Sequence, residues 1–399
     1  MDNPVVTKKD STEAASTALA TAAANGILTI DLDALVSNWR KLESRAVPAE
    51  CAAVVKGNAY GCGAGPVARA LAFAGCSTFF VATLSEARAL REVAPIAIIY
   101  VLNGFFPNSG DAYAQIGCRP VIGDLAELAE WDMFCRTTGW SGGCAIHVDT
   151  GMSRLGLTLA DAQGLSPRIQ SGAHGFKLVM SHLACAELPD HPLNARQLDA
   201  FREVAHLFSG IPASIAASSG IFLGPQYTFE MVRPGAALYG INPTPEADNP
   251  MTPVIGLTAR IAQIRTVEKG DTVGYGAAWT ARRASRIAIL SVGYADGYFR
   301  AAGGGEGKRN AEVMIGGERC SIVGRISMDL LAVDITELSS GAAKRGQMAT
   351  LIGDGITLEE LGHHFGTIGY EVLTSLGPRY HRIYREVGAD KQKQPAAEG

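Results

Sequence analysis

Residues 52–61, with the sequence AAVVKGNAYG, join an uninterrupted apolar run to a lysine, a tyrosine and two glycines. Continuous apolar runs are typical of strands buried on both faces, so Lys56 marks the point where the chain leaves a core. In α/β proteins, ligands bind at the carboxyl ends of the strands. A lysine at a strand edge is commonly a side chain whose charged end reaches solvent. A desolvated lysine amine, however, condenses with a carbonyl group, which predicts an aldehyde ligand.

The composition indicates a globular enzyme rather than a nucleic-acid-binding or membrane protein. The chain has 399 residues, 47% hydrophobic and 19% charged, enough for two domains or one large barrel with an appendage. A net charge of −4 offers no basic surface for nucleic acid. No apolar run approaches the ~18 residues of a membrane helix. Eight cysteines without a C-x-x-C pair favour reduced thiols and a cytoplasmic location over disulfides or zinc.

Short apolar runs alternate with amphipathic stretches through the first part of the chain. Residues 1–26 are expected to form a flexible tail. A strand at 28–32 and a helix at 34–45 come next, followed by eight further predicted strands, at 51–56, 78–83, 96–102, 118–122, 144–149, 176–182, 212–218 and 231–239. The segments between them have helical spacing. Eight strand–helix units predict a TIM-type (β/α)₈ barrel over residues 27–250.

The pattern changes near Pro243, where four prolines punctuate a polar stretch. Residues 251–388 are predicted to form a mostly β domain, because β-branched runs follow one another without long helices. Its predicted strands lie at 256–266, 286–292, 312–315, 319–323, 331–335 and 348–352. A single helix is expected from Thr357, its N-cap, to His364. Residues 389–399 are expected to be a tail.

Five polar groups follow or end strands of the predicted barrel, and they should therefore converge on one mouth. They are Lys56, Arg154, His182, Ser219 and Arg233. Together they suit a phosphorylated aldehyde cofactor: Lys56 supplies the amine, and Ser219 with the Gly235 backbone suits a phosphate. An arginine would then face the ring nitrogen, and His182 could pack near the ring.

The chain resembles the alanine racemases, two-domain pyridoxal phosphate enzymes of fold type III, from about residue 28 to residue 384. The motifs that carry the resemblance are AVVK at 53–56 with YG at 60–61, DTGM at 149–152 with RLG at 154–156, VRPG at 232–235, VGYG at 273–276, VGYADG at 292–297 and GRISMD at 324–329. The resemblance implies interconversion of L-alanine and D-alanine, either supplying D-alanine for peptidoglycan or consuming alanine.

The resemblance also implies roles for individual residues. Lys56 would hold the cofactor covalently and act as one base, and Tyr275, from the partner subunit of a homodimer, would be the second base. The implied cofactor-binding residues are Lys56, Tyr60, Arg154, His182, Ser219, Arg233, Gly235, Ala236 and Tyr370. The implied substrate-binding residues are Arg154, Met328, Tyr294 and Tyr370. The implied entry corridor comprises Tyr294, Arg300, Arg325, Ile368 and Tyr370.

The sequence departs from the family pattern at four places. His147 stands where the family often has a carbamylated lysine that orients Arg154, so Arg154 needs another partner, such as chloride or a carboxylate. The other departures are Ser218 in place of asparagine, Glu187 in place of aspartate, and Cys62 in place of histidine. None of them removes a reacting group.

Several alternatives share parts of this pattern. A racemase for serine or for a broader range of amino acids would use the same fold and cofactor. A decarboxylase of this fold type would need a catalytic cysteine, and no matching motif surrounds Cys320. A non-catalytic pyridoxal phosphate carrier would not need Tyr275, and an aldolase using Lys56 alone would not need the phosphate site. The pair His363–His364 is expected to be solvated rather than metal-binding.

Overall fold

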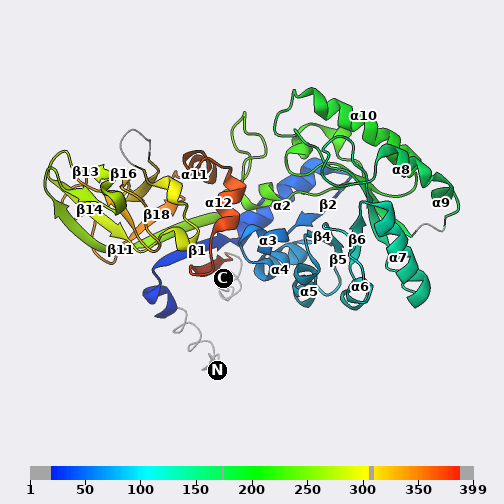
Figure 1. Cartoon of the computed structure of the whole chain (residues 1–399), viewed down its shortest axis with the longest axis horizontal. Helices are drawn as coiled ribbons and strands as arrows, with labels where there is room; N and C mark the ends of the chain where they lie inside the picture. Colours follow the sequence, from blue (N-terminus) through cyan, green and yellow to red (C-terminus); the bar gives the residue numbers. More distant parts are fainter. Residues whose placement is uncertain (1–18, 173–174, 305–309, 387–399) are drawn as a thin grey trace, which may run out of the picture. The chain divides into compact units, whose positions relative to one another are not determined.

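The computed structural model describes residues 19–172, 175–304 and 310–386, which form two compact units. The first runs from Leu32 to Pro253 and is called the barrel unit. The second combines the described residues before Leu32 with those from Val254 onward and is called the β unit (Figure 1). The tail expected at 389–399 and the first part of the one expected at 1–26 lie outside the described residues. Within the latter, residues 19–23 are helical.

Parallel strands form the centre of the barrel unit. Seven of them pair in chain order: β3 (Ala53–Val54), β4 (Thr78–Val81), β5 (Ile98–Val101), β6 (Arg119–Ile122), β7 (Cys144–His147), β8 (Phe176–Met180) and β9 (Ala213–Ser214). The eighth strand, β10 (Met231–Val232), pairs in parallel with β2 (Glu50–Cys51), which leads into β3. On the other side of β10, the Arg233 N–H donates to the carbonyl oxygen of Ala216 (2.9 Å). The ring is therefore closed, and the predicted TIM-type barrel is confirmed.

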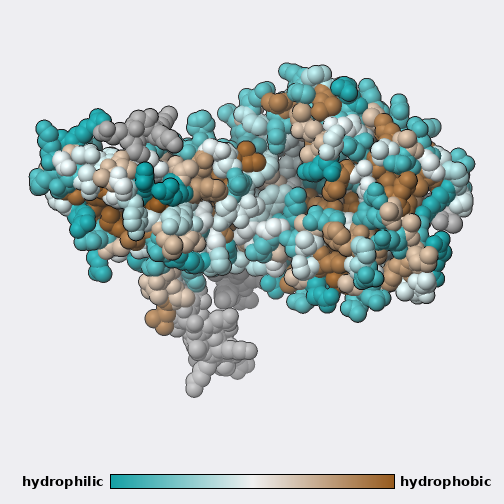
Figure 2. Space-filling view, viewed as in Figure 1, coloured by the Kyte–Doolittle hydropathy of each residue, from teal (hydrophilic) through white to brown (hydrophobic). Residues whose placement is uncertain are grey.

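Helices surround these strands, as Figure 1 shows. They are α2 (Leu32–Ala46), α4 (Ala64–Ala74), α5 (Leu84–Val93), α6 (Gly110–Ile116), α7 (Leu125–Thr138), α8 (Leu159–Gly164), α9 (Ser166–Gln170) and α10 (Pro192–Leu207). The short segment α3 (Lys56–Tyr60) is a left-handed turn rather than a regular helix. The loops after β9 and β10 hold three 3₁₀ helices, η1 (Ser219–Phe222), η2 (Pro225–Tyr227) and η3 (Ala236–Tyr239). On the face of this unit seen in Figure 2, apolar residues gather over the strands and hydrophilic residues over the outer helices.

The inside of the barrel is a packed core. Strand residues that point inward form one buried cluster, which comprises Ala52, Val54, Phe80, Tyr100, Val121, Ala145, Leu178, Met180 and Met231. This layering of inward side chains is what a closed eight-stranded barrel requires. It blocks the barrel from within, so a ligand can be held only at one of its ends.

The strands are shorter than the sequence predicts. The run at 231–239 was expected to be one strand, but only Met231–Val232 is extended and Ala236–Tyr239 is a 3₁₀ helix. The whole run is buried, so its apolar composition does not distinguish the two conformations. His182 lies two residues beyond β8 rather than in it.

The β unit contains one sheet of eight strands. In sheet order they are β14 (Ser285–Leu290), β17 (Leu331–Asp334), β16 (Glu318–Val323), β15 (Glu312–Ile315), β18 (Met348–Ile352), β11 (Ile255–Val267), β1 (Gly26–Asp31) and β19 (His381–Arg385). The long strand β11 also pairs with β14, which closes six of these strands into a ring. The predicted mostly β domain is confirmed.

The first strand of the chain belongs to the β unit, although the barrel was expected to begin at residue 27. β1 pairs antiparallel with β11 and parallel with β19, so its backbone bonds lie in the β unit's sheet. Near the end of the chain there are two helices rather than the single one predicted. α11 (Leu358–Phe365) begins at the expected N-cap, Thr357, and α12 (Gly369–Ser375) follows.

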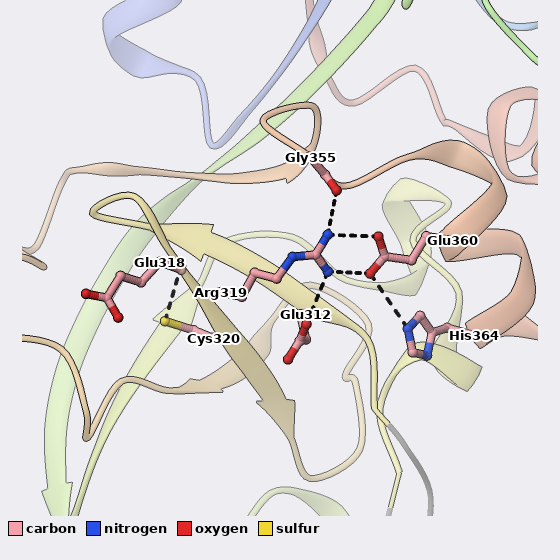
Figure 3. Close-up of polar contacts among 7 residues, drawn as sticks. All are labelled: Glu312, Glu318, Arg319, Cys320, Gly355, Glu360 and His364. Carbon is pink, nitrogen blue, oxygen red and sulfur yellow. Dashed lines mark hydrogen bonds and ion pairs between the residues drawn. The ribbon is translucent and has the colours of Figure 1, made fainter. Parts of the chain in front are cut away.

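An ion-pair network ties α11 to the sheet of the β unit (Figure 3). Arg319 of β16 donates to both carboxylate oxygens of Glu360 on α11 (2.5 and 3.0 Å) and to Glu312 of β15 (3.2 Å). His364 Nε2 lies 4.0 Å from Glu360 Oε1. The His364 side chain is only 8% exposed, so this histidine is not solvated, contrary to the expectation from the sequence. Within the part of the chain that the structure describes, no helix is long and apolar enough to cross a membrane.

Candidate active site

Lys56 begins a turn of left-handed backbone at the end of β3. The φ angles of the four residues after it are 63° at Gly57, 55° at Asn58, 54° at Ala59 and 53° at Tyr60. Glycine adopts this conformation freely and asparagine tolerates it, but for alanine and tyrosine it costs roughly 1–2 kcal/mol per residue. Strain of this kind persists only where the surrounding structure holds it, and it is concentrated at functional sites.

The turn is held from both ends. The Glu86 carboxylate on α5 accepts hydrogen bonds from the N–H groups of Gly57 (2.6 Å) and Asn58 (3.4 Å). At the other end, the Asn58 side-chain oxygen accepts from the Ala64 N–H (2.9 Å). Burial lowers the pKa of the Lys56 amine, and the charge of Arg154 lowers it further, while Glu86 acts in the opposite direction. A larger fraction of this amine is therefore neutral than in an ordinary exposed lysine, and the neutral form is the one that attacks a carbonyl group.

Tyr60, at the end of the turn, packs against Gly235. A Cβ atom on Gly235 would lie 3.1 Å from Tyr60 Cζ and closer still to its hydroxyl oxygen. The Ser218 hydroxyl oxygen accepts from the N–H groups of Gly235 and Ala237 (both 3.1 Å), so the Gly235 N–H that was expected to hold a phosphate is engaged within the chain.

Three donors next to this contact have no acceptor in the part of the chain that the structure describes. They are the hydroxyl groups of Tyr60 and Ser219 and the N–H of Ala236. Ser219 is buried, and burial raises the pKa of Tyr60 to about 12, so the phenol stays protonated and able to donate. A group of donors without acceptors suits an anion such as phosphate.

Arg233 follows β10 and is almost completely buried. Its guanidinium donates to the Ser214 hydroxyl oxygen and to the Ser181 carbonyl oxygen (2.6 Å) and lies over the Phe80 ring, 5.9 Å from the centroid. Burial lowers the pKa of Arg233 to about 9, which still leaves it positively charged at neutral pH. These contacts fix the guanidinium rigidly at the barrel mouth.

His182 is positioned by Gln197, a fully buried residue of α10 whose role the sequence analysis missed. The Gln197 amide donates to the carbonyl oxygen of His182 (2.9 Å) and accepts from the N–H of Ala184 (2.9 Å). It also donates to the Thr150 hydroxyl (3.3 Å), which is hydrogen-bonded to Ser181 (2.8 Å). No motif distinguishes such a glutamine in the sequence, because its partners come from loops far away along the chain.

Arg154 is carried by a loop that Asp149 shapes. The Asp149 carboxylate accepts from the N–H groups of Gly151 (2.9 Å), Met152 (2.8 Å) and Ser153 (2.9 Å to its nearer oxygen). Burial raises the pKa of Asp149, but these N–H groups lower it by more, so the pKa is lowered overall. Arg154 itself is exposed and makes no hydrogen bond with another described residue.

The mouth as a whole is electropositive. Burial and the charges of Arg233 and Arg154 lower the pKa of His147 to about 4, and the same effects lower that of His182 to about 3. Both rings are therefore neutral at pH 7. The structure thus brings together Lys56, Arg154, His182 and Arg233 as the sequence predicted, and the arrangement favours an anionic ligand.

The remaining candidates lie in the β unit. Tyr275 occupies the tip of a small hairpin formed by β12 (Thr272–Val273) and β13 (Trp279–Thr280), and 71% of its surface is exposed. A Cβ atom on the next residue, Gly276, would lie 2.7 Å from Arg325 Nη1. The φ of Gly276 is 69°, a left-handed value that favours glycine, so the backbone beside Tyr275 at the hairpin tip suits glycine.

Met328 and Tyr294 lie on neighbouring loops of the β unit. The Ala295 N–H donates to the Met328 carbonyl oxygen (2.9 Å), and the Tyr294 N–H donates to that of Ser327 (3.1 Å). Met328 and Tyr294 are exposed, and Tyr370, in the first turn of α12, is half-buried. The β unit therefore presents large apolar side chains to solvent at these loops.

Comparison with known proteins places the chain in a family. Models of the alanine racemase N-terminal and C-terminal domains match residues 30–243 and 254–384. An alanine racemase of Methylobacterium nodulans is 53% identical over 92% of this chain and 98% of its own length. A catabolic alanine racemase of Mesorhizobium japonicum is 45% identical, over 91% of this chain and 94% of its own. A biosynthetic alanine racemase of Agrobacterium fabrum is 43% identical, over 90% of this chain and 93% of its own length.

Solved structures agree with these matches. The crystal structure of alanine racemase from Bartonella henselae, with covalently bound pyridoxal phosphate, superposes with a TM-score of 0.86 at 40% identity. The superposition covers 91% of this chain and 100% of the Bartonella henselae chain. The barrel unit and the β unit correspond to the N-terminal and C-terminal domains that these models describe, so the chain is a two-domain protein of the racemase class. The chain belongs to the alanine racemase family.

Proposed function

We infer that this chain is a pyridoxal phosphate-dependent racemase that interconverts L-alanine and D-alanine. The observation that carries this conclusion is a lysine of lowered pKa at the barrel mouth, next to three donors without an acceptor among the described residues, in a member of the alanine racemase family. A related structure holds pyridoxal phosphate covalently. The product would serve peptidoglycan synthesis, or the reaction would consume alanine, within the cytoplasm.

The residues at the mouth fit this cofactor. A phosphate needs several donors, and the hydroxyls of Tyr60 and Ser219 and the N–H of Ala236 are available for it. Gly235 has no Cβ atom, and this leaves room for the Tyr60 phenol, which a Cβ atom at position 235 would displace. Lys56 would hold the aldehyde carbon. The donor set, the space and the nucleophile all favour the same ligand.

When bound, pyridoxal phosphate supplies an electron-withdrawing ring that stabilises negative charge on the substrate Cα. Arg233 would donate to the ring nitrogen. An arginine, unlike a carboxylate, disfavours protonation of that nitrogen, which limits charge delocalisation and suppresses side reactions. The rigid contacts of Arg233 with Ser214 and Ser181 would keep it in this position. Arg154 would bind the substrate carboxylate, and His182 would pack beside the ring.

Racemisation removes a proton from one face of Cα and returns one to the other, so it requires a base on each face. Lys56 would be the first base. Tyr275, 71% exposed, would be the second and would come from the partner subunit of a homodimer. Met328, through its backbone N–H, Tyr294 and Tyr370 would complete the substrate site. Tyr275, Tyr294 and Met328 are exposed and therefore accessible to a partner subunit, as this assignment requires.

A chiral chromatographic assay tests the function directly. Purified protein with added pyridoxal phosphate should be yellow and should bring either enantiomer of alanine to an equal mixture, with serine and larger amino acids converted much more slowly. Lys56→Ala should abolish both the colour and the conversion. A colourless wild-type protein that leaves L-alanine unchanged would contradict the proposal, and faster conversion of serine would assign the chain to a different racemase.

A further inference from the structure

The left-handed turn that carries Lys56 depends on a carboxylate from another strand–helix unit. Glu86 lies at the third position of α5 and forms a capping box with Thr83. One of its oxygens, Oε2, accepts from the N–H groups of Ala82 (2.8 Å) and Thr83 (3.3 Å), at the start of its own helix. The other oxygen, Oε1, accepts from Gly57 (2.6 Å) and Asn58 (3.4 Å). A single carboxylate therefore joins α5 to the first two residues after Lys56.

The same arrangement recurs in the barrel at a loop that carries none of the proposed cofactor residues. Glu127 lies at the third position of α7, and its Oε2 accepts from the N–H of Gly123 (2.7 Å) before that helix. Its Oε1 accepts from the N–H of Phe105, in the loop after β5. Glu86 and Glu127 thus hold the loop of the preceding strand in equivalent ways, but only the loop held by Glu86 carries a reactive amine.

The geometry points to Glu86 as the residue that positions Lys56: we propose that its carboxylate holds the left-handed turn and thereby directs the Lys56 amine at the cofactor aldehyde. The inference rests on the proposed role of Lys56. Ala59 and Tyr60 adopt left-handed backbone against their preference, so the turn needs a strong acceptor at its opening residues, Gly57 and Asn58, to hold it. A carboxylate accepting N–H groups is such an acceptor.

Glu86 also acts on Lys56 through its charge. The charged or titratable groups that influence the amine are Arg154, His182 and Glu86. Burial and Arg154 lower the pKa of Lys56, whereas Glu86 raises it. Loss of the Glu86 charge should therefore lower that pKa further. A residue that only stabilised the fold would not produce this shift.

Three variants of the full-length holoenzyme separate these effects. Glu86→Gln retains the size of the side chain but has one acceptor oxygen for two sets of donors. Glu86→Asp retains the charge and both oxygens but is one methylene shorter. Glu127→Gln is the matched control, because it makes the same change in the equivalent arrangement. The measurements are amide hydrogen exchange of the peptide spanning residues 56–61, affinity for pyridoxal phosphate, and the pH midpoint of its attachment.

Glu86→Gln should accelerate amide exchange in this peptide at least tenfold and weaken the affinity for pyridoxal phosphate at least tenfold. It should also lower the pH midpoint of cofactor attachment. Glu86→Asp should preserve the midpoint, and Glu127→Gln should stay within twofold of wild type throughout. Wild-type exchange in Glu86→Gln would overturn the inference, as would faster exchange with unchanged affinity. If Glu86→Gln does not fold, Glu86→Asp decides: faster exchange and weaker affinity support the inference, and wild-type values overturn it.

The proposed function is checked separately in the wild-type protein. Borohydride reduction should fix the cofactor on Lys56, as peptide mapping would reveal. If Lys56 carries no cofactor, the proposed function fails and the positioning of Lys56 fails with it. If Lys56 carries the cofactor and Glu86→Gln behaves as wild type, only the inference about Glu86 fails.

Discussion

Tyr60 and Gly235 are in mutual contact at the barrel mouth: Tyr60 Cζ lies 3.1 Å from the position that a Cβ atom would take on Gly235, and the hydroxyl oxygen lies closer. The two residues are remote in sequence and come from the loops after the first and last strands of the barrel. Their contact therefore exists only because the barrel closes. Glycine at position 235 leaves the Tyr60 hydroxyl in place as a donor beside Ser219 and Ala236.

Gly235→Ala should weaken binding of pyridoxal phosphate about tenfold or more, because the added methyl group displaces the Tyr60 hydroxyl. Titration of the cofactor-free protein by absorbance would measure the loss of affinity. Gly164→Ala is the control, since a Cβ atom there meets no atom within 4 Å. Equal affinities in the two variants would exclude this explanation.

Asp149→Ala should reduce kcat/KM for alanine by about 10- to 100-fold, because the loop that presents Arg154 loses the acceptor for three N–H groups. Asp149→Asn, which retains one carbonyl oxygen, should lose less. Steady-state kinetics in both directions would measure the effect. Asp124→Ala is the control: it removes the N-cap of α7 and costs stability, while the hydrogen bonds that Asp124 accepts come from α7 and not from this loop. A comparable loss of activity in the control would show that stability alone is responsible.

The arrangement of the barrel could be predicted because its strands are uninterrupted apolar runs, and the parallel order then brought Lys56, Arg154, His182 and Arg233 to one mouth. The lengths of the elements could not be predicted. The run at 231–239 is buried whether it is extended or helical, so hydrophobicity carries no information about its conformation. The partners of β1 are likewise remote in sequence, so nothing local indicated that it joins the β unit.

Long-range polar contacts at the site were also beyond sequence reasoning. The pattern Thr83-x-x-Glu86 predicts a capping box, which the structure has, but the bonds from Gly57 and Asn58 depend on α5 lying beside the turn. The pair Gly57–Asn58 favours left-handed backbone, whereas Ala59 and Tyr60 do not. Tertiary contacts impose left-handed backbone on Ala59 and Tyr60, so local residue preferences do not predict it.

Stability should fall as the pH drops below about 6.5. Burial and the charges of Arg233 and Arg154 lower the pKa of His147 from its ordinary 6.5 to about 4. Between these values the unfolded chain binds a proton that the folded protein does not. The stability present above pH 6.5 is therefore lost towards pH 4, by an amount on the order of 3 kcal/mol.

Urea unfolding of the cofactor-free protein at pH 7.5 and 5 would measure this loss. His147→Gln remains neutral and should lose less stability than wild type over this range, while exposed His206→Gln should behave as wild type. His182, with a pKa lowered to about 3, contributes a loss of the same sign in all three proteins. An identical loss in His147→Gln and wild type would contradict the assignment to His147.

Lys56 and Tyr275 are proposed to be two bases contributed by different subunits, and hybrid dimers of inactive variants test this arrangement. Lys56→Ala and Tyr275→Phe, each nearly inactive alone, would be co-expressed with different tags. Random pairing should restore about a quarter of wild-type activity, because half of the dimers are hybrids and each hybrid has one intact site. Purified hybrids should retain about half. Hybrids no more active than the two parents would contradict a site shared between subunits.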